Sequence, residues 1–288
     1  MNIRIIARMD IKGPNLVKGI HLEGLRVLGK PELFARYYYE NGADELMYTD
    51  VVASLYERNS LHEIISKTAK MSFIPLTVGG GLRTIDDIKS VLRAGADKVS
   101  LNTAAIKNPE IIREASKIFG SSTIAVTIEA IKELDGRYLC YTDNGREFTG
   151  IDAFLWAKKV EELGAGEIVV TSVDREGTGI GFDVELTKKI AGLVSIPVIA
   201  HGGAGKLSHI KEVIAEGNAS AVAVASMLHY DLIKKTNDIS VFSGEEGNFE
   251  FLKSGKTFSH IEPRSMEEIK KYLFENNIPC RHKIGGAK

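Results

Sequence analysis

The stretch PLTVGGGLRTIDDIKSVLRAGADKVSLNTAA (residues 75–105) has a second version in the same chain, PVIAHGGAGKLSHIKEVIAEGNASAVAVASM (residues 197–227). The second version lies 122 positions after the first, so that Gly80 matches Gly202. Upstream, GADELMYTD from Gly42 matches GAGEIVVTS at the same spacing. An internal repeat of this length predicts two halves of similar size and similar fold.

Each half alternates short Val-, Ile- and Leu-rich runs, such as ELMYTDV, with segments of helical period, such as TIDDIKSVLRAGA. Four strand–helix units per half make eight, and strands buried on both faces indicate a parallel sheet. We therefore predict an α/β fold in which residues 1–288 form a single (β/α)8 barrel of two duplicated half-barrels. A doubly wound open sheet is the alternative, but its halves would not normally repeat this evenly. In such barrels the chemistry lies at the carboxyl ends of the strands.

Composition excludes several classes of function. The chain has 37 basic and 38 acidic residues and a net charge of -1, which argues against a nucleic-acid or acidic-membrane surface. Cys140 and Cys280 have no metal-ligand or redox spacing, and no apolar run approaches the ~20 residues of a membrane span. We expect a cytoplasmic protein with a small-molecule ligand, no cofactor and no bound metal.

Glycine-rich loops follow the third and seventh predicted strands, GGGLRT and GGAGKL. Each places backbone N–H groups at the start of a helix, where an anion is favoured. Their neighbours at the same edge are SLNTAA and AVASM, after the fourth and eighth strands. Two equivalent pockets indicate a ligand with a phosphate at each end, although a tight strand–helix turn also explains glycines.

Two related strands end in a carboxylate, RIIARMDIKG with Asp10 and IAVTIEAIKE with Glu129. As the ends of the first and fifth strands, they are expected to face each other across the barrel axis. Such a pair can act as general acid and base on one substrate, while helix capping is the alternative role.

Charged residues stand at the starts of four strands, at the opposite mouth of the predicted barrel: Arg4, Glu45, Lys98 and Glu167. Their charges sum to zero. Solvated surface ion pairs, which contribute little, are the alternative to a functional cluster.

Together, RIIARMDIKGPNLVKG, GADELMYTD, TVGGGLRTIDD, GADKVSLNTAA and GGAGK resemble the cyclase subunit of imidazole glycerol phosphate synthase over nearly the whole barrel. The resemblance implies a glutaminase subunit docked on the N-terminal face, ammonia passing through the barrel, and a phosphorylated substrate at the C-terminal face. It implies an ammonia gate formed by the four strand-start charges. It also implies polar substrate contacts from Lys18 and Asp50, and from Glu176 and His201 at two positions where this chain departs from the family. The phosphate-binding residues that it implies are Gly81, Asn102 and Thr103 for one end of the ligand, and Gly177, Gly203, Ala225 and Ser226 for the other.

The departures from that family lie at the chemical face. The second catalytic acid is Glu129 rather than Asp, Glu176 replaces an Asp in DREGT, His201 replaces a Ser, and Arg8 stands where Cys is common. An acid one methylene longer moves its carboxylate enough to cost on the order of 100-fold in rate. An insertion at about 231–264, between the eighth strand and the last helix, is expected to cover the mouth or dock a partner, or to be surface elaboration.

The stretch from Arg8 to Gly29, RMDIKGPNLVKGIHLEGLRVLG, is most similar to a branch of the family associated with glycosyl amidation. That resemblance implies the synthase subunit of a glutamine amidotransferase complex, of cyclase and lyase ancestry. Such a subunit relays ammonia to a sugar amidotransferase on the C-terminal face during surface-polysaccharide assembly. Three alternatives stay open: an authentic cyclase of histidine biosynthesis, a non-catalytic scaffold that activates the glutaminase, and a related sugar-phosphate isomerase.

Overall fold

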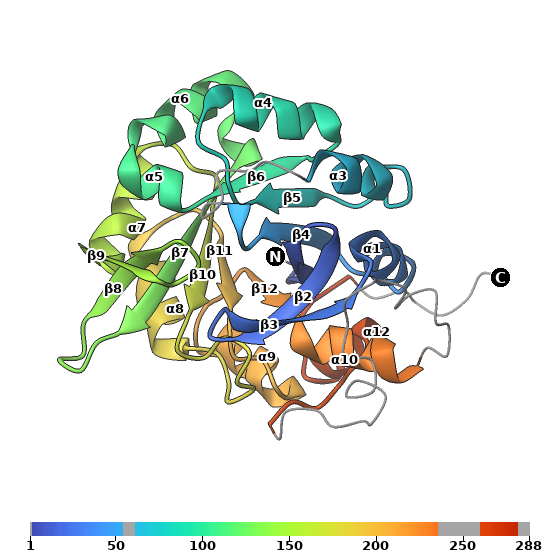
Figure 1. Ribbon diagram of the computed structural model, residues 1–288. Helices are drawn as coiled ribbons and strands as arrows, with labels where there is room; N and C mark the ends of the chain where they lie inside the picture. Colours follow the sequence, from blue (N-terminus) through green and yellow to red (C-terminus); the bar gives the residue numbers. More distant parts are fainter. Residues whose placement is uncertain (1, 54–60, 236–259, 282–288) are drawn as a thin grey trace.

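Eight parallel strands close into a barrel in the computed structural model, which describes residues 2–53, 61–235 and 260–281 (Figure 1). The order around the barrel is β1, β4, β5, β6, β7, β10, β11 and β12, and β12 pairs with β1 to complete the circle. The predicted (β/α)8 barrel is therefore confirmed. The barrel strands are β1 (Arg4–Lys12), β4 (Glu45–Asp50), β5 (Leu76–Gly79), β6 (Lys98–Leu101), β7 (Ile124–Lys132), β10 (Glu167–Ser172), β11 (Val198–His201) and β12 (Ala221–Val224).

Helices surround the barrel and cover its outer face (Figure 1). A 3-10 turn, Ser121–Thr123, precedes β7. The described helices are α1 (Pro31–Glu40), α3 (His62–Ala69), α4 (Ile85–Ala94), α5 (Thr103–Lys107), α6 (Glu110–Phe119), α7 (Ala153–Glu162), α8 (Val184–Leu193), α9 (Leu207–Ala215), α10 (Ser226–Lys235) and α12 (Met266–Glu275).

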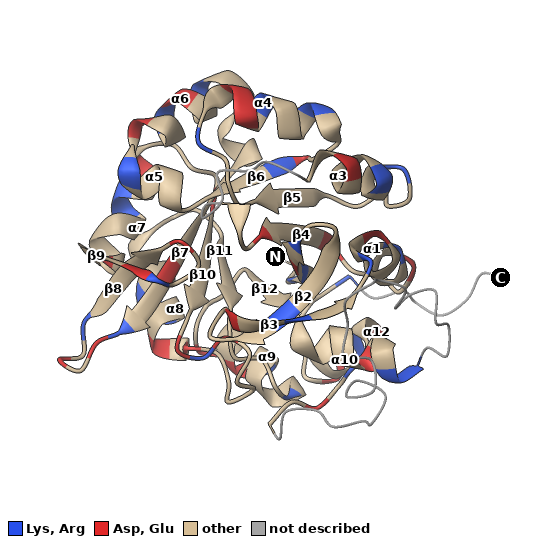
Figure 2. Cartoon of the chain, in the orientation of Figure 1, with Lys and Arg blue, Asp and Glu red and all other residues tan. Residues whose placement is uncertain are grey.

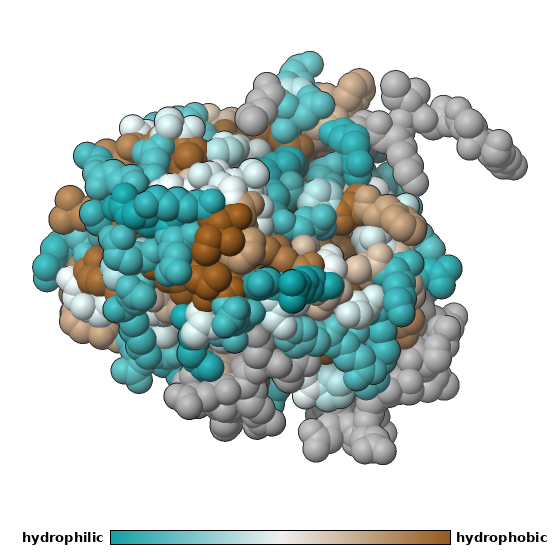
Figure 3. Space-filling view, turned by 90° about the horizontal axis from the view of Figure 1, so that it is seen from above, coloured by the Kyte–Doolittle hydropathy of each residue, from teal (hydrophilic) through white to brown (hydrophobic). Residues whose placement is uncertain are grey.

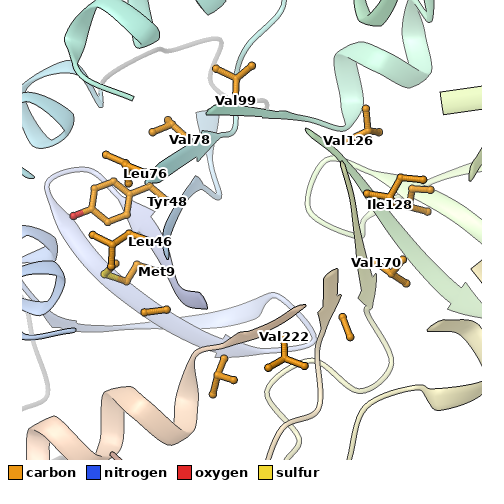
Figure 4. Close-up of a cluster of buried hydrophobic side chains, with 14 of the residues drawn as sticks. Met9, Leu46, Tyr48, Leu76, Val78, Val99, Val126, Ile128, Val170 and Val222 are labelled. Carbon is orange, nitrogen blue, oxygen red and sulfur yellow. The ribbon is translucent and has the colours of Figure 1, made fainter. Parts of the chain in front are cut away.

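Alternate residues of each strand face opposite sides of the barrel wall. The outward residues, such as Leu46, Val126 and Val222, pack between strands and helices in the main core (Figure 4). The inward residues form a smaller, separate apolar cluster inside the barrel: Ile6, Met47, Val169, Ile199, Ala221 and Ala223. The polar and charged inward residues at each mouth are therefore held by strands whose other face is fixed in a close-packed core.

The repeated stretch folds alike in both halves. Gly80 has a φ of +93°, and a Cβ there would lie 2.2 Å from the carbonyl oxygen of Asp50. Its counterpart Gly202 has a φ of +94°, and its Cβ would lie 2.6 Å from the carbonyl oxygen of Ser172, which is 122 residues after Asp50. The glycines are thus required by the same close approach of a strand–helix turn to the neighbouring strand.

Two features differ from the sequence prediction. Each half carries an unforeseen antiparallel hairpin after its first strand, β2 (Asn15–Ile20) with β3 (Glu23–Gly29), and β8 (Tyr138–Thr142) with β9 (Glu147–Asp152). An insertion that begins at about residue 231 implies an eighth strand that runs to about Tyr230, but the strand ends at Val224. Residues from Ser226 onward form α10. The sequence did not show this boundary, because apolar residues continue from the strand into the helix without a turn signal. Residues 236–259, most of the expected insertion, lie outside the described residues, whereas 231–235 belong to α10.

Acidic and basic residues are interspersed over the outer helices (Figure 2). Viewed from above, apolar patches lie among hydrophilic groups (Figure 3). None of the helices in the described ranges has the length and apolar character that crossing a bilayer requires.

Candidate active site

The two hairpins meet over the C-terminal mouth of the barrel. Asn144, in the turn between β8 and β9, donates a side-chain hydrogen bond of 2.8 Å to the carbonyl oxygen of Leu22, between β2 and β3. These two residues are 122 positions apart, so the contact joins equivalent points of the two halves. Residues buried beneath the hairpins are therefore enclosed by both half-barrels.

Asp10 and Glu129 occupy equivalent places in the two halves. Asp10 is paired with Thr49 of the next strand, and Glu129 with Thr171, which is 122 residues after Thr49. Both carboxyl side chains are buried, with 1% and 5% of the residue exposed. The structure thus places both predicted acids inside the C-terminal mouth.

Cations fix the Asp10 carboxylate. Arg8 donates from Nε to Oδ1 at 3.2 Å, and Nζ of Lys18, on β2, lies 3.5 Å from Oδ2. Burial alone would raise the pKa of Asp10, but the charges of Arg8 and Lys18 outweigh it and hold that pKa below its usual range. Asp10 therefore remains ionised and can act as a base or an electrostatic stabiliser.

Glu129 has a different environment. Its Oε2 accepts a hydrogen bond of 2.8 Å from the backbone N–H of Gly145, in the second hairpin turn. Burial raises the pKa of Glu129 to about 7, although Arg8 and the Gly145 N–H oppose the rise. A carboxyl that titrates near neutral pH can both give and take a proton, as general acid–base catalysis requires.

Glu176 and Lys18 form a buried ion pair that ties the first hairpin to the loop after β10. The second Glu176 oxygen, Oε2, accepts from the Leu22 N–H at 3.1 Å. Burial would lower the pKa of Lys18, but Glu176 and Asp10 outweigh it, so the pKa is raised and the ammonium is retained. Three of the predicted polar residues are thus joined in one charged network.

A cavity of about 290 Å³ opens beside Glu129, at the ends of β5, β6 and β7. Among its lining residues are the first predicted phosphate set and Asp50, whose Oδ1 accepts from the Val52 N–H at 3.1 Å. Backbone N–H groups at the start of a helix and polar side chains suit an anionic group. The predicted residues that line this cavity are Asp50, Gly81, Asn102, Thr103 and Glu129.

The second predicted phosphate set does not line this cavity. The carbonyl oxygen of Gly203 accepts from the Gly181 N–H at 2.8 Å, and Gly177 packs against the backbone of Gly19. Ala225 and Ser226 are buried where α10 begins. The structure therefore gathers one set around a cavity and places the other on the opposite half of the mouth.

A ring of four charges closes the N-terminal mouth. Arg4 lies 2.7 Å from Glu45 and 2.8 Å from Glu167, and Lys98 lies 3.4 Å and 3.2 Å from the same two residues. Burial would lower the pKa of Arg4, but the two carboxylates outweigh it and raise that pKa. We call these four residues the charged ring; they alternate in sign and are held inside the mouth rather than on an open surface.

Comparison with known proteins bears on this geometry. The model of one family, described as histidine biosynthesis protein, matches residues 4–234, which span all eight barrel strands. The chain belongs to the histidine biosynthesis protein family.

Individual relatives of the family are similar over most of their length. Each of three bears the name imidazole glycerol phosphate synthase subunit HisF. The protein of Legionella pneumophila is 58% identical over 72% of this chain and 97% of its own. The protein of Saccharolobus solfataricus is 46% identical over 85% of this chain and 96% of its own length. The protein of Methanocaldococcus jannaschii is 43% identical over 96% of this chain and 98% of its own length. None of these names refers to glycosyl amidation, so the comparison favours the alternative of an authentic synthase subunit over the predicted amidation branch.

Some residues of the site in this family member were missed by sequence reasoning. Arg8 was noted only as a departure, yet its Nη1 lies 3.0 Å from Nδ1 of His201 and 3.4 Å from Oγ1 of Thr171, inside the barrel. The signal was present, because an arginine within a buried strand requires buried partners. The hairpin residues Asn144 and Gly145 gave no such signal.

Proposed function

We propose that this chain is the cyclase subunit of an imidazole glycerol phosphate synthase, which receives ammonia from a glutaminase and uses it on a bis-phosphate substrate. The observation that supports this proposal most is that one barrel carries a charged entrance at one mouth and a candidate catalytic site at the other. The charged ring lies at one mouth, and Asp10, Glu129 and a phosphate-compatible cavity lie at the other. The names of the relatives support the same activity.

In this proposal the chain's own residues divide the work. The cavity around Gly81, Asn102 and Thr103 holds one phosphate of the substrate. Asp10 stays ionised beside Lys18 and stabilises positive charge that develops on the reacting ring. Glu129, with a pKa of about 7, moves the proton. The glutaminase docks on the N-terminal face, where the charged ring admits ammonia.

A second candidate, relay of ammonia for glycosyl amidation, is favoured by one specific observation. Arg8 binds Asp10 directly, and His201 contacts Arg8. Arg8 thereby occupies one carboxylate oxygen of Asp10, while the charged ring is complete. The second acid, Glu129, is a glutamate. In this candidate a sugar amidotransferase on the C-terminal face receives the ammonia.

The deciding experiment is turnover of the histidine-pathway bis-phosphate substrate with ammonium salts supplied directly, for the native chain and for Glu129→Asp. Ready turnover by the native chain supports the cyclase. Turnover only after Glu129→Asp, or none in either chain while a cognate glutaminase is still stimulated, supports the relay. Glu114→Asp, on the exposed face of α6, is the matched control for shortening a glutamate.

A further inference from the structure

Arg8 crosses the interior of the barrel just below the C-terminal mouth. Its guanidinium reaches from β1 to Thr171 on β10 and to His201 on β11, and only 1% of the residue is exposed. Below it lies the inner apolar cluster, which includes Ile6 and Val169. On this side, therefore, the interior is filled by apolar side chains and covered by a fixed cation.

The corresponding position in the second half-barrel holds a much smaller residue. Arg8 is paired with Met47, and Thr127 is paired with Val169, which is 122 residues after Met47. Thr127 is thus the counterpart of Arg8. Thr127 lines the cavity and is partly exposed, whereas its paired neighbour Val169 is completely buried. Arg8 also contributes to the wall of this cavity, although only 1% of the residue is exposed.

The cavity also descends toward the charged ring between β6 and β7. Its lining includes Ser100, whose Oγ lies 2.6 Å from Oγ1 of Thr127. Ser100 follows Lys98 by two residues on β6, a rise of about 7 Å along a strand. The floor of the cavity is therefore one layer of inward residues above the ring.

We propose that Arg8 seals the barrel interior on the side of β1, β10 and β11, so that ammonia admitted at the charged ring leaves beside Ser100 and Thr127, beneath Glu129. That the molecule passing through the barrel is ammonia rests on the proposed function. Hydroxyl groups on the open side can exchange hydrogen bonds with ammonia, and the fixed guanidinium repels ammonium in a medium of low dielectric constant. The two half-barrels thus give the passage one exit, next to the carboxyl that titrates near neutral pH.

Cysteine labelling tests the seal without substrate or turnover. In the full chain with Cys140→Ala and Cys280→Ser, we compare Thr127→Cys with Val169→Cys, which are paired at the same height. Their reaction with methyl methanethiosulfonate is followed by mass spectrometry. With Arg8 present, the cysteine at 127 should react about tenfold faster than the one at 169, because only the former faces the cavity. Equal rates would overturn the proposal.

A second experiment removes Arg8 and tests whether this residue protects position 169. Arg8→Ala should raise the rate at 169 about tenfold and change the rate at 127 less than about twofold. Arg8→Met, which keeps the volume of the side chain, should leave 169 protected and controls for general loosening of the barrel. An unchanged rate at 169 in Arg8→Ala would show that Arg8 seals nothing.

A third measurement tests where ammonia leaves the barrel interior. Thr127→Leu narrows the open side and Val169→Leu enlarges a residue on the sealed side. The ratio of glutamine-driven to ammonium-driven turnover, with the glutaminase present, should fall about tenfold in the first variant and stay within about twofold in the second. Equal effects in both variants would contradict an exit beside Thr127. Failure of the native chain to turn over the substrate would count against the proposed function, and the labelling rates would still decide the seal.

Discussion

Glu129→Gln replaces a buried carboxyl by an amide of nearly the same shape, and its effect on stability should depend on pH. Burial raises the pKa of Glu129 from 4.5 to about 7 in the folded chain. The folded state therefore binds this proton more tightly than the unfolded state does, and ionisation opposes folding. The penalty is absent below a pH of about 4.5, grows as the pH rises toward about 7, and reaches about 3 kcal/mol above that.

The amide does not ionise, so the variant escapes this penalty and can still accept the hydrogen bond from Gly145. Apart from a constant offset, Glu129→Gln should gain about 3 kcal/mol over the native chain between a pH of about 5 and about 8. Urea unfolding at a series of pH values measures the difference. Glu114→Gln, which removes an exposed carboxylate, is the control. A difference between Glu129→Gln and the native chain that stays constant with pH would refute the reasoning.

Three further predictions concern the other parts of the site. Lys18→Met removes the cation paired with the buried Glu176 and one of the two cations beside Asp10, and should lower the free energy of unfolding by about 3–5 kcal/mol. Lys132→Met, at an exposed pair with Glu185, should lower it much less, and chemical denaturation compares the two variants. Gly81→Ala forces a side chain onto a backbone with a φ of +72°. It should therefore cost about 1–3 kcal/mol and weaken binding of inorganic phosphate in calorimetry. Lys98→Met leaves the two acids of the charged ring with one cation and should lower stability by about 1 kcal/mol at low salt and by less at high salt; a loss that is independent of salt would contradict an electrostatic cause.

The features that sequence reasoning predicted well are those set by strand position. A repeat at a fixed spacing specified eight strands, and the ends of parallel strands in a barrel converge whatever the loops between them do. Glu45 and Glu167 could therefore be placed at one mouth, and Asp10 and Glu129 at the other, before their neighbours were known. The same rule gathered Gly81, Asn102 and Thr103 around one cavity.

What sequence reasoning missed depends on reach across the barrel. Each hairpin directly follows a barrel strand and folds back over the C-terminal mouth. Only this fold brings the Gly145 N–H within hydrogen-bond distance of Glu129. The length of the arginine at position 8 matters only because Thr171 and His201 lie opposite, on strands more than 160 residues away. Local patterns of polarity do not encode such partners.

The two half-barrels differ at both mouths, which fits an asymmetric task. At the entrance, Glu45 and Glu167 are repeat counterparts, and each binds both cations of the charged ring. At the exit, the same interior position holds Arg8 in one half and Thr127 in the other. Both cations of the ring, Arg4 and Lys98, come from the first half. Delivery of a small molecule to one reacting atom likewise requires a single exit. The arginine that binds Asp10 can therefore serve both needs, since it fixes one carboxylate in its ionised form and leaves the open side to Glu129.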